Sequence, residues 1–221
     1  MSISNNLTKI KASLPSHVTL VAVSKTKPVA DLMEAYEAGH RIFGENKIQE
    51  MTEKWEVMPK DIQWHMIGHV QTNKVKFMAE YVSLIHGVDS LKLLQEINKQ
   101  GKKHDRVIDV LLQIYIAEEE SKFGLDENEL NELLQHVQNE KSSFANINIV
   151  GLMGMATFTE NQNQIEKEFK HLKTVFDTIN SKDAINRVST LSMGMSGDYQ
   201  LAISCGSTMV RIGSSIFGTR N

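Results

Sequence analysis

Short apolar segments alternate with amphipathic segments eight times along this 221-residue chain, and this alternation constrains the fold more than any other feature. Each apolar segment is typical of a buried strand, and the segment after it has helical spacing of its apolar residues. Strands are expected at residues 18–24, 41–46, 62–68, 82–89, 107–117, 147–156, 188–194 and 209–218. Helices are expected at residues 28–39, 47–57, 71–79, 91–99, 126–137, 165–179 and 198–204, with a brief closing helix or none after the last strand.

Eight such units favour a closed barrel of parallel strands, because parallel strands are buried on both faces. An open, doubly wound parallel sheet is the alternative. No Pro/Gly/Ser-rich linker or charge block divides the chain, and its length suits one domain. We therefore expect an α/β fold, a single (β/α)8 TIM-type barrel with an N-terminal helix, covering residues 1–221 as one domain.

Composition narrows the range of partners. A formal net charge of −3 and a pI near 6.2 argue against a protein that neutralises nucleic-acid phosphates or an anionic membrane. A single cysteine, Cys205, excludes an internal disulfide, the N-terminus does not resemble a signal peptide, and no apolar run approaches the roughly 20 residues of a membrane span. We expect a cytoplasmic monomer that binds a small molecule and neither nucleic acid nor membrane.

Lys25 stands at the end of the first apolar segment, in the sequence VTLVAVSKTKP. In a barrel of this type, functional groups gather at the C-terminal ends of the strands, here called the mouth. Strand alternation places Thr19, Val21, Val23 and Lys25 on one face, and an interior face would carry the amine into the mouth. A partly desolvated amine has a lowered pKa and forms Schiff bases with carbonyl compounds. A solvated lysine at a strand end is the alternative.

The segments after the seventh and eighth strands, LSMGMSGDYQ and RIGSSIFG, are rich in glycine and serine. Barrels commonly bind phosphate in these two loops. Glycines let backbone N–H groups approach an anion, serines add hydroxyl donors, and short helices after the loops add positive dipole ends. Tight turns alone would explain either loop, but two such loops at this place favour a phosphate site. The residues are Ser192, Gly194, Ser196, Gly197, Gly213, Ser214 and Ser215.

Arg211 lies in the last expected strand, where a buried guanidinium needs an acceptor. A ligand nitrogen or a carboxylate would serve, and so would a salt bridge to Asp89 or Glu45. Glu45 and Asn46 close the second strand, where either side chain would line the mouth or cap the following helix. For Glu45 we expect that the side chain caps the following helix.

The remaining candidates favour packing over chemistry. The spacing HMIGH, His65 and His69, spans a strand end and its loop and lies outside any HExxH motif, so we expect no metal site. Cys205 is expected to be a small buried residue rather than a nucleophile. Four methionines beside glycines are expected to pack the mouth: Met153, Met155, Met193 and Met195.

Seven motifs in order along nearly the whole chain resemble the pyridoxal phosphate homeostasis proteins, relatives of the alanine racemase N-terminal barrel. They are AVSKTKP, FGENKIQE, WHMIGHVQTNK, SKFGL, GLMGMA, LSMGMSGDYQLAI and GSTMVRIGSSIFG. The resemblance implies a barrel of PLP fold type III that binds pyridoxal 5′-phosphate (PLP). The segment GHVQTNK departs from the proline-containing version expected in many bacterial members, which affects the detail of that loop.

The same resemblance implies the residues of the cofactor site. Lys25 would carry PLP as an internal aldimine, and Asn46 would lie near the ring. The phosphate would be held by Ser192, Gly213 and Ser214. Arg211 would face the pyridine nitrogen, and no catalytic residue is expected.

Two features argue against efficient turnover. Arg211 keeps its proton at neutral pH, so a pyridine nitrogen that faces it stays unprotonated and the ring is a poorer electron sink. The resemblance also implies that racemases use a tyrosine from an additional C-terminal β domain of the partner subunit. The sequence ends at Asn221, so we expect that domain to be absent, with no evident replacement among Tyr36, Tyr81, Tyr115 and Tyr199.

We therefore expect a PLP-binding protein that stores, buffers or delivers the cofactor, with transient contact with apo PLP enzymes and no substantial turnover. A small PLP-dependent amino-acid racemase or lyase is the alternative. A barrel aldolase that uses Lys25 without a cofactor is a third possibility.

Overall fold

The computed structural model describes residues 2–118, 123–181 and 188–219, and its strands form a closed parallel barrel. Neighbouring strands pair in sequence order, and the eighth closes onto the first, with Val21 beside Arg211. The predicted barrel is confirmed, and the open sheet is excluded. The strands are β1 (Thr19–Val23), β2 (Ile42–Glu45), β3 (Gln63–Met66), β4 (Leu84–Val88), β5 (Ile108–Gln113), β6 (Ile147–Met153), β7 (Thr190–Met195) and β8 (Met209–Ile212).

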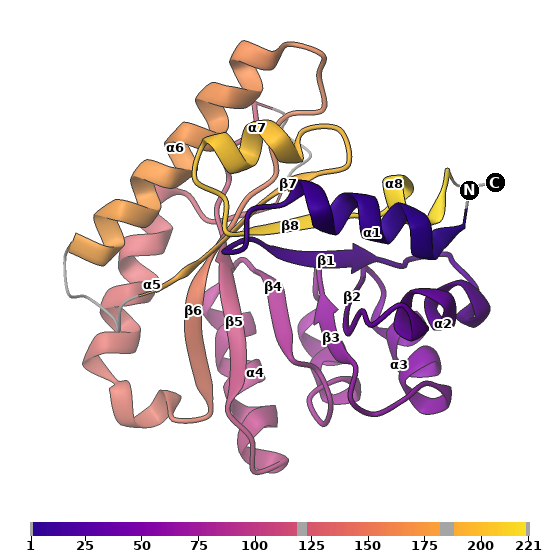
Figure 1. Ribbon diagram of the computed structural model, residues 1–221. Helices are drawn as coiled ribbons and strands as arrows, with labels where there is room; N and C mark the ends of the chain where they lie inside the picture. Colours follow the sequence, from indigo (N-terminus) through magenta and orange to yellow (C-terminus); the bar gives the residue numbers. More distant parts are fainter. Residues whose placement is uncertain (1, 119–122, 182–187, 220–221) are drawn as a thin grey trace.

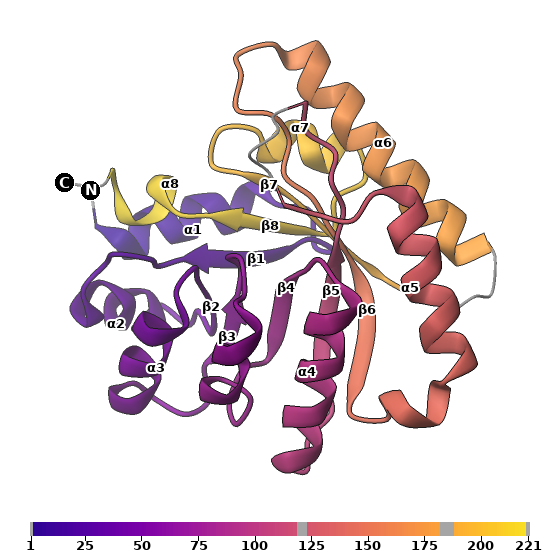
Figure 2. The same ribbon diagram turned by 180° about the vertical axis from the view of Figure 1, so that it is seen from behind.

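Helices surround the barrel on its outer side (Figures 1 and 2). The predicted N-terminal helix is present as α1, which lies beside the short C-terminal helix α8 and is joined to it by a hydrogen bond of 3.1 Å from Asn6 Nδ2 to the Ile216 carbonyl. In the part of the chain that the structure describes, no helix is both long and apolar enough to cross a membrane. The helices are α1 (Ile3–Ser13), α2 (Val29–Glu37), α3 (Ile48–Val57), α4 (Leu91–Lys103), α5 (Glu127–Asn139), α6 (Gln162–Ser181), α7 (Tyr199–Ser204) and α8 (Ser214–Phe217).

One predicted helix has a different type. Residues 71–79 were expected to form an α-helix, but the segment is a 3-10 helix, η1 (Thr72–Phe77). Val75 is buried within η1, and Met78 is buried directly after it. Their spacing of three residues fits a helix with three residues per turn as well as an α-helix with 3.6 residues per turn. A second 3-10 helix, η2 (Lys141–Phe144), precedes β6.

Side chains inside the barrel form two layers of different character. An apolar cluster fills the lower layer with Val21, Leu84, Leu111, Met153 and Met209. Nearer the mouth, the strands present buried polar side chains instead: His65, His86, Gln113, Ser192 and Arg211. Residues between these positions, such as Trp64 and Val210, point outward and pack in the larger core beneath the helices. The barrel is thus packed below and polar above, so ligand chemistry is confined to the mouth.

Candidate functional site

A cavity of about 610 Å³ lies at the C-terminal ends of the strands. Its lining comes from the segments after seven different strands, as expected for a site at a barrel mouth. Five of the six predicted site residues line it: Lys25, Asn46, Arg211, Gly213 and Ser214. Residues that are distant in the sequence are therefore brought together at the predicted end of the barrel.

Lys25 lies in the turn after β1 rather than in the strand itself. The turn is closed by a hydrogen bond of 3.1 Å from the Lys27 N–H to the Ser24 carbonyl, and Thr26 has a φ of +63°. Val21 belongs to the interior cluster, and Val23 and Lys25 line the cavity above it. The predicted shared face of these three residues is confirmed.

The loops after β7 and β8 meet on one side of the cavity. Gly194 has a φ of +97°, which favours glycine, and the Met195 N–H donates to Asp198 Oδ1 at 2.5 Å, which closes the turn. Ser196 Oγ accepts a hydrogen bond of 3.2 Å from the Gly213 N–H and so joins the two loops. Both loops line the cavity through four residues: Ser196, Gly197, Gly213 and Ser214.

Ser192, the sixth predicted site residue, is buried beside the Arg211 guanidinium and His86. Its side chain is fully buried, accepts a hydrogen bond of 2.6 Å from Arg211 Nη1, and lies 3.1 Å from His86 Nδ1. It is not among the described residues that line the cavity. Alternation along β7 points Ser192 into the barrel, whereas Ser196 lies in the loop after β7.

Arg211 is 4% exposed and reaches the cavity from inside β8. Burial lowers the pKa of its guanidinium to about 10, and Asp198 opposes this shift, so the group is charged at neutral pH. Its second hydrogen bond runs from Nη2 to the Gly154 carbonyl at 3.1 Å. The alternative of a salt bridge to Asp89 or Glu45 is wrong, because Asp89 pairs with a histidine and Glu45 with a lysine.

The two histidines considered as a metal pair, His65 and His69, have different surroundings in the structure. His65 points into the barrel, 3.1 Å from His86, and burial lowers the pKa of His65 to about 3 and that of His86 well below its ordinary value. His69 lies at the rim, 3.2 Å from Asp89. The described part of the chain contains no group of three or more side chains able to hold a metal ion.

Of the four methionines expected to pack the mouth, Met155 and Met195 line the cavity. Met153 lies instead in the interior cluster below the mouth, and Met193 faces outward into the core under the helices. Its position in β7 next to Ser192 explains this, since successive side chains alternate. Cys205 is buried, and burial raises the pKa of its thiol, in agreement with a packing role.

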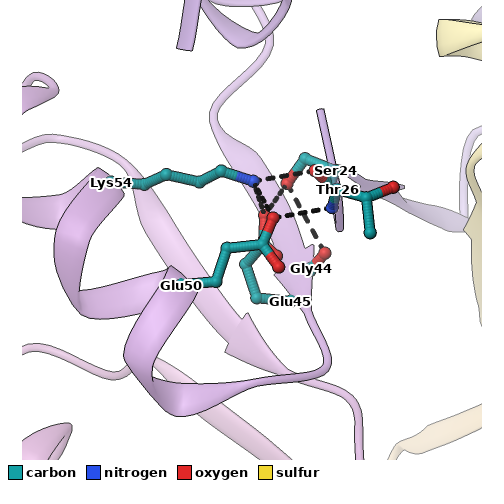
Figure 3. A network of polar contacts seen from close by, with 6 residues as sticks. All are labelled: Ser24, Thr26, Gly44, Glu45, Glu50 and Lys54. Atoms are coloured by element: carbon teal, nitrogen blue, oxygen red, sulfur yellow. Dashed lines mark hydrogen bonds and ion pairs between the residues drawn. The ribbon is translucent and has the colours of Figure 1, made fainter. Parts of the chain in front are cut away.

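Ser24 and Thr26, the sequence neighbours of Lys25, contact a charged network that the sequence analysis did not predict (Figure 3). Lys54 Nζ donates to Glu45 Oε1 and Glu50 Oε1, both at 2.7 Å, and to the Ser24 carbonyl at 2.8 Å. Glu45 also accepts from Ser24 Oγ at 2.5 Å and does not cap α3, so the capping prediction was wrong. One feature of the sequence indicates the network: Lys54 follows Met51 by three residues and so lies on the apolar face of the expected helix.

A barrel with this polar mouth defines a protein of the alanine racemase N-terminal type. The family model described as "Alanine racemase, N-terminal domain" matches residues 1–221, and the chain belongs to that family. It is also 37% identical to the pyridoxal phosphate homeostasis protein of Pasteurella multocida over 100% of this chain and 99% of that relative. The chain is a member of the pyridoxal phosphate homeostasis protein family.

Solved structures agree with this assignment. PipY of Synechococcus elongatus without PLP is 33% identical, covers 98% of this chain and 100% of its own, and superposes with a TM-score of 0.91. The structure of PipY with PLP bound is 32% identical over the same shares, with a TM-score of 0.87. Alanine racemase of Clostridium difficile, at 16% identity over 99% of this chain and 56% of its own, shares the fold with a TM-score of 0.78.

Part of the motif SKFGL, residues 121 and 122, lies outside the described residues.

Proposed function

We propose that this chain binds PLP through Lys25 and takes part in PLP homeostasis by storing, buffering or delivering the cofactor. The observation that carries the proposal is one cavity that brings together a primary amine, a buried guanidinium and two glycine-rich and serine-rich loops. A relative at 32% identity, PipY, has been solved with PLP bound, which supports the same ligand here.

The residues present fit this cofactor. When bound, PLP supplies an aldehyde that reacts with an amine and a phosphate that needs hydrogen-bond donors. Lys25 offers the amine, and the loop residues Ser196, Gly197, Gly213 and Ser214 offer the donors. Asn46 Oδ1 is buried without a hydrogen-bond partner although Asn46 lines the cavity, so its amide is available to a ligand. Arg211 would hold the ring nitrogen as a hydrogen-bond acceptor.

We propose that turnover is not substantial. Arg211 keeps its proton, and among the described residues of the cavity lining the other ionisable side chains are Lys25, Lys27, His69 and Asp198. The four tyrosines, Tyr36, Tyr81, Tyr115 and Tyr199, are not in that lining. His69 favours the alternative of a small racemase or lyase, because an imidazole can transfer protons. It stacks on Phe123 with ring centroids 4.1 Å apart, which ties it to the rim.

The proposal includes the setting in which the protein works. We place it in the cytoplasm as one PLP-binding domain that meets apo PLP enzymes transiently. We also propose that it acts as a monomer.

Cofactor transfer tests the proposal. The protein loaded with PLP is mixed with an apo PLP enzyme, and its visible absorption is followed together with the activity that the enzyme gains. We expect the absorption of the protein to fall as the enzyme becomes active, and assays with a panel of amino acids to give no sustained turnover. Rapid racemisation or cleavage of an amino acid would favour the enzyme alternative. A purified protein that never binds PLP would contradict the proposal and favour the aldolase.

A further inference from the structure

Both neighbours of Lys25 in the sequence are anchored to the same helix (Figure 3). On one side, the Ser24 carbonyl accepts a hydrogen bond of 2.8 Å from Lys54 Nζ. On the other side, the Thr26 N–H donates to Glu50 Oε1 at 2.6 Å. Glu50 and Lys54 are one turn apart on α3 and form an ion pair of 2.7 Å. The backbone of Lys25 is thus held from both sides by two charged side chains of α3.

Burying the charged groups of this network costs free energy. The Lys54 side chain is 7% exposed, and its two carboxylate partners, Glu45 and Glu50, are 0% and 22% exposed. Removing such charges from water is costly, and apolar residues at such positions are often at least as stabilising. Thr26, with a φ of +63°, also adopts a left-handed conformation that is unfavourable for a β-branched residue. Buried charge and backbone strain meet directly beside Lys25, and such features cluster at functional sites.

We propose that Glu50 and Lys54 are positioning residues that fix the backbone on both sides of Lys25 and aim its amine at the aldehyde of PLP. This inference rests on the proposed function. The Lys25 amine attacks the aldehyde carbon, a C=N bond replaces the C=O bond, and the oxygen leaves as water with two protons from the amine. Fixing the backbone favours this bond by orientation, without touching the phosphate loops.

The inference predicts different effects on the affinities for PLP and for pyridoxamine 5′-phosphate, whereas a general loss of structure would weaken both. PLP can bond to Lys25, whereas pyridoxamine 5′-phosphate has the same ring and phosphate but no aldehyde. Loss of the anchor should therefore weaken the binding of PLP and leave the binding of pyridoxamine 5′-phosphate unchanged. The ratio of the two dissociation constants measures the positioning of Lys25.

The test compares Glu50→Ala with Glu56→Ala, a change of an exposed glutamate on the same helix. For Glu50→Ala we expect PLP to bind about tenfold more weakly, the loss of one charge-assisted contact, with little change for pyridoxamine 5′-phosphate. Glu56→Ala should leave both constants unchanged. Glu50→Gln keeps an acceptor for the Thr26 N–H and should recover part of the loss. In the protein without ligand, amide exchange of Thr26 should be faster in Glu50→Ala than in the native protein.

The outcomes distinguish this inference from the proposed function. Native protein that binds PLP no better than pyridoxamine 5′-phosphate would overturn binding through Lys25, and the inference with it. Native protein that prefers PLP, with the same preference in Glu50→Ala and Glu50→Gln, would overturn the inference alone. Equal weakening of both ligands in Glu50→Ala, or unchanged exchange of the Thr26 amide, would also overturn it, because the role of Glu50 would then be general.

Discussion

Arg211 Nη1 donates a hydrogen bond of 2.6 Å to Ser192 Oγ inside the barrel, and this contact starts a chain of buried polar groups. Since the guanidinium can only donate, the Ser192 hydroxyl is free to donate its own proton to His86 Nδ1, 3.1 Å away. His86 Nε2 then donates to His65 Nδ1 at 3.1 Å. Every contact in the chain is satisfied with both imidazoles neutral. Arg211 is held in place by groups that do not take its proton.

Replacement of Ser192 tests this support. Ser192→Ala leaves the buried Arg211 and His86 each without one partner, so we expect the free energy of unfolding to fall by about 1–3 kcal/mol. The visible spectrum of bound PLP should also change, because Arg211 keeps its hydrogen bond to the Gly154 carbonyl but loses the one to Ser192. Denaturant unfolding and absorption spectroscopy measure the two effects. Ser204→Ala, at an exposed serine that donates to the Leu201 carbonyl, is the control, and equal stability of both variants would contradict the role of Ser192.

The phosphate loops give a separate prediction. Ser196→Ala combined with Ser214→Ala should weaken PLP binding at least about tenfold, since each charge-assisted hydrogen bond contributes about 1.5–3 kcal/mol. Pyridoxal, which lacks the phosphate, should bind poorly to the native protein and be affected little by the double change. Equilibrium binding of both ligands measures this. Equal binding of pyridoxal and PLP to the native protein would show that these loops do not hold the phosphate.

A buried histidine predicts acid sensitivity. His40 is 5% exposed, and burial, with repulsion from Lys11, lowers its pKa from 6.5 to about 4. Between these values the unfolded chain binds a proton that the folded chain does not, so stability falls as the pH falls through this range, by up to about 3 kcal/mol. Unfolding measured from pH 7 to pH 4 should show this decline, and His40→Gln should make it less steep without abolishing it, because burial also lowers the pKa of His65 and His86. The exposed His17→Gln should not, and an equal decline in all three proteins would contradict the assignment.

Much of the fold follows from periodicity. The strand beginning at Thr19 and the loops near Gly194 and Gly213 were predictable because alternation and glycine placement are local properties of the chain. The type of η1 was not, because three-residue spacing fits two kinds of helix.

The details of the site depend on distant contacts. A period of two tells which face of β7 carries Ser192 but not which layer of the barrel, and hence not that Ser196 is nearer the cavity. Glu45 and Lys54 are nine residues apart and meet only after β2 and α3 pack together. Charged residues are mostly exposed, and the position of Lys54 on the apolar face of its helix did not identify Glu45 as its buried partner.

Reduction with borohydride tests covalent binding to Lys25 most directly, because it converts the C=N bond to a stable C–N bond. After incubation with PLP and reduction, peptide mass spectrometry should place the added cofactor on Lys25 in the native protein. Lys27→Ala is the matched control, since Lys27 also lines the cavity but donates to the Phe217 and Thr219 carbonyls, and it should be labelled like the native protein. Lys25→Ala should remain folded by circular dichroism and carry no label. An undiminished label in Lys25→Ala, or a label on another lysine of the native protein, would contradict the assignment of Lys25.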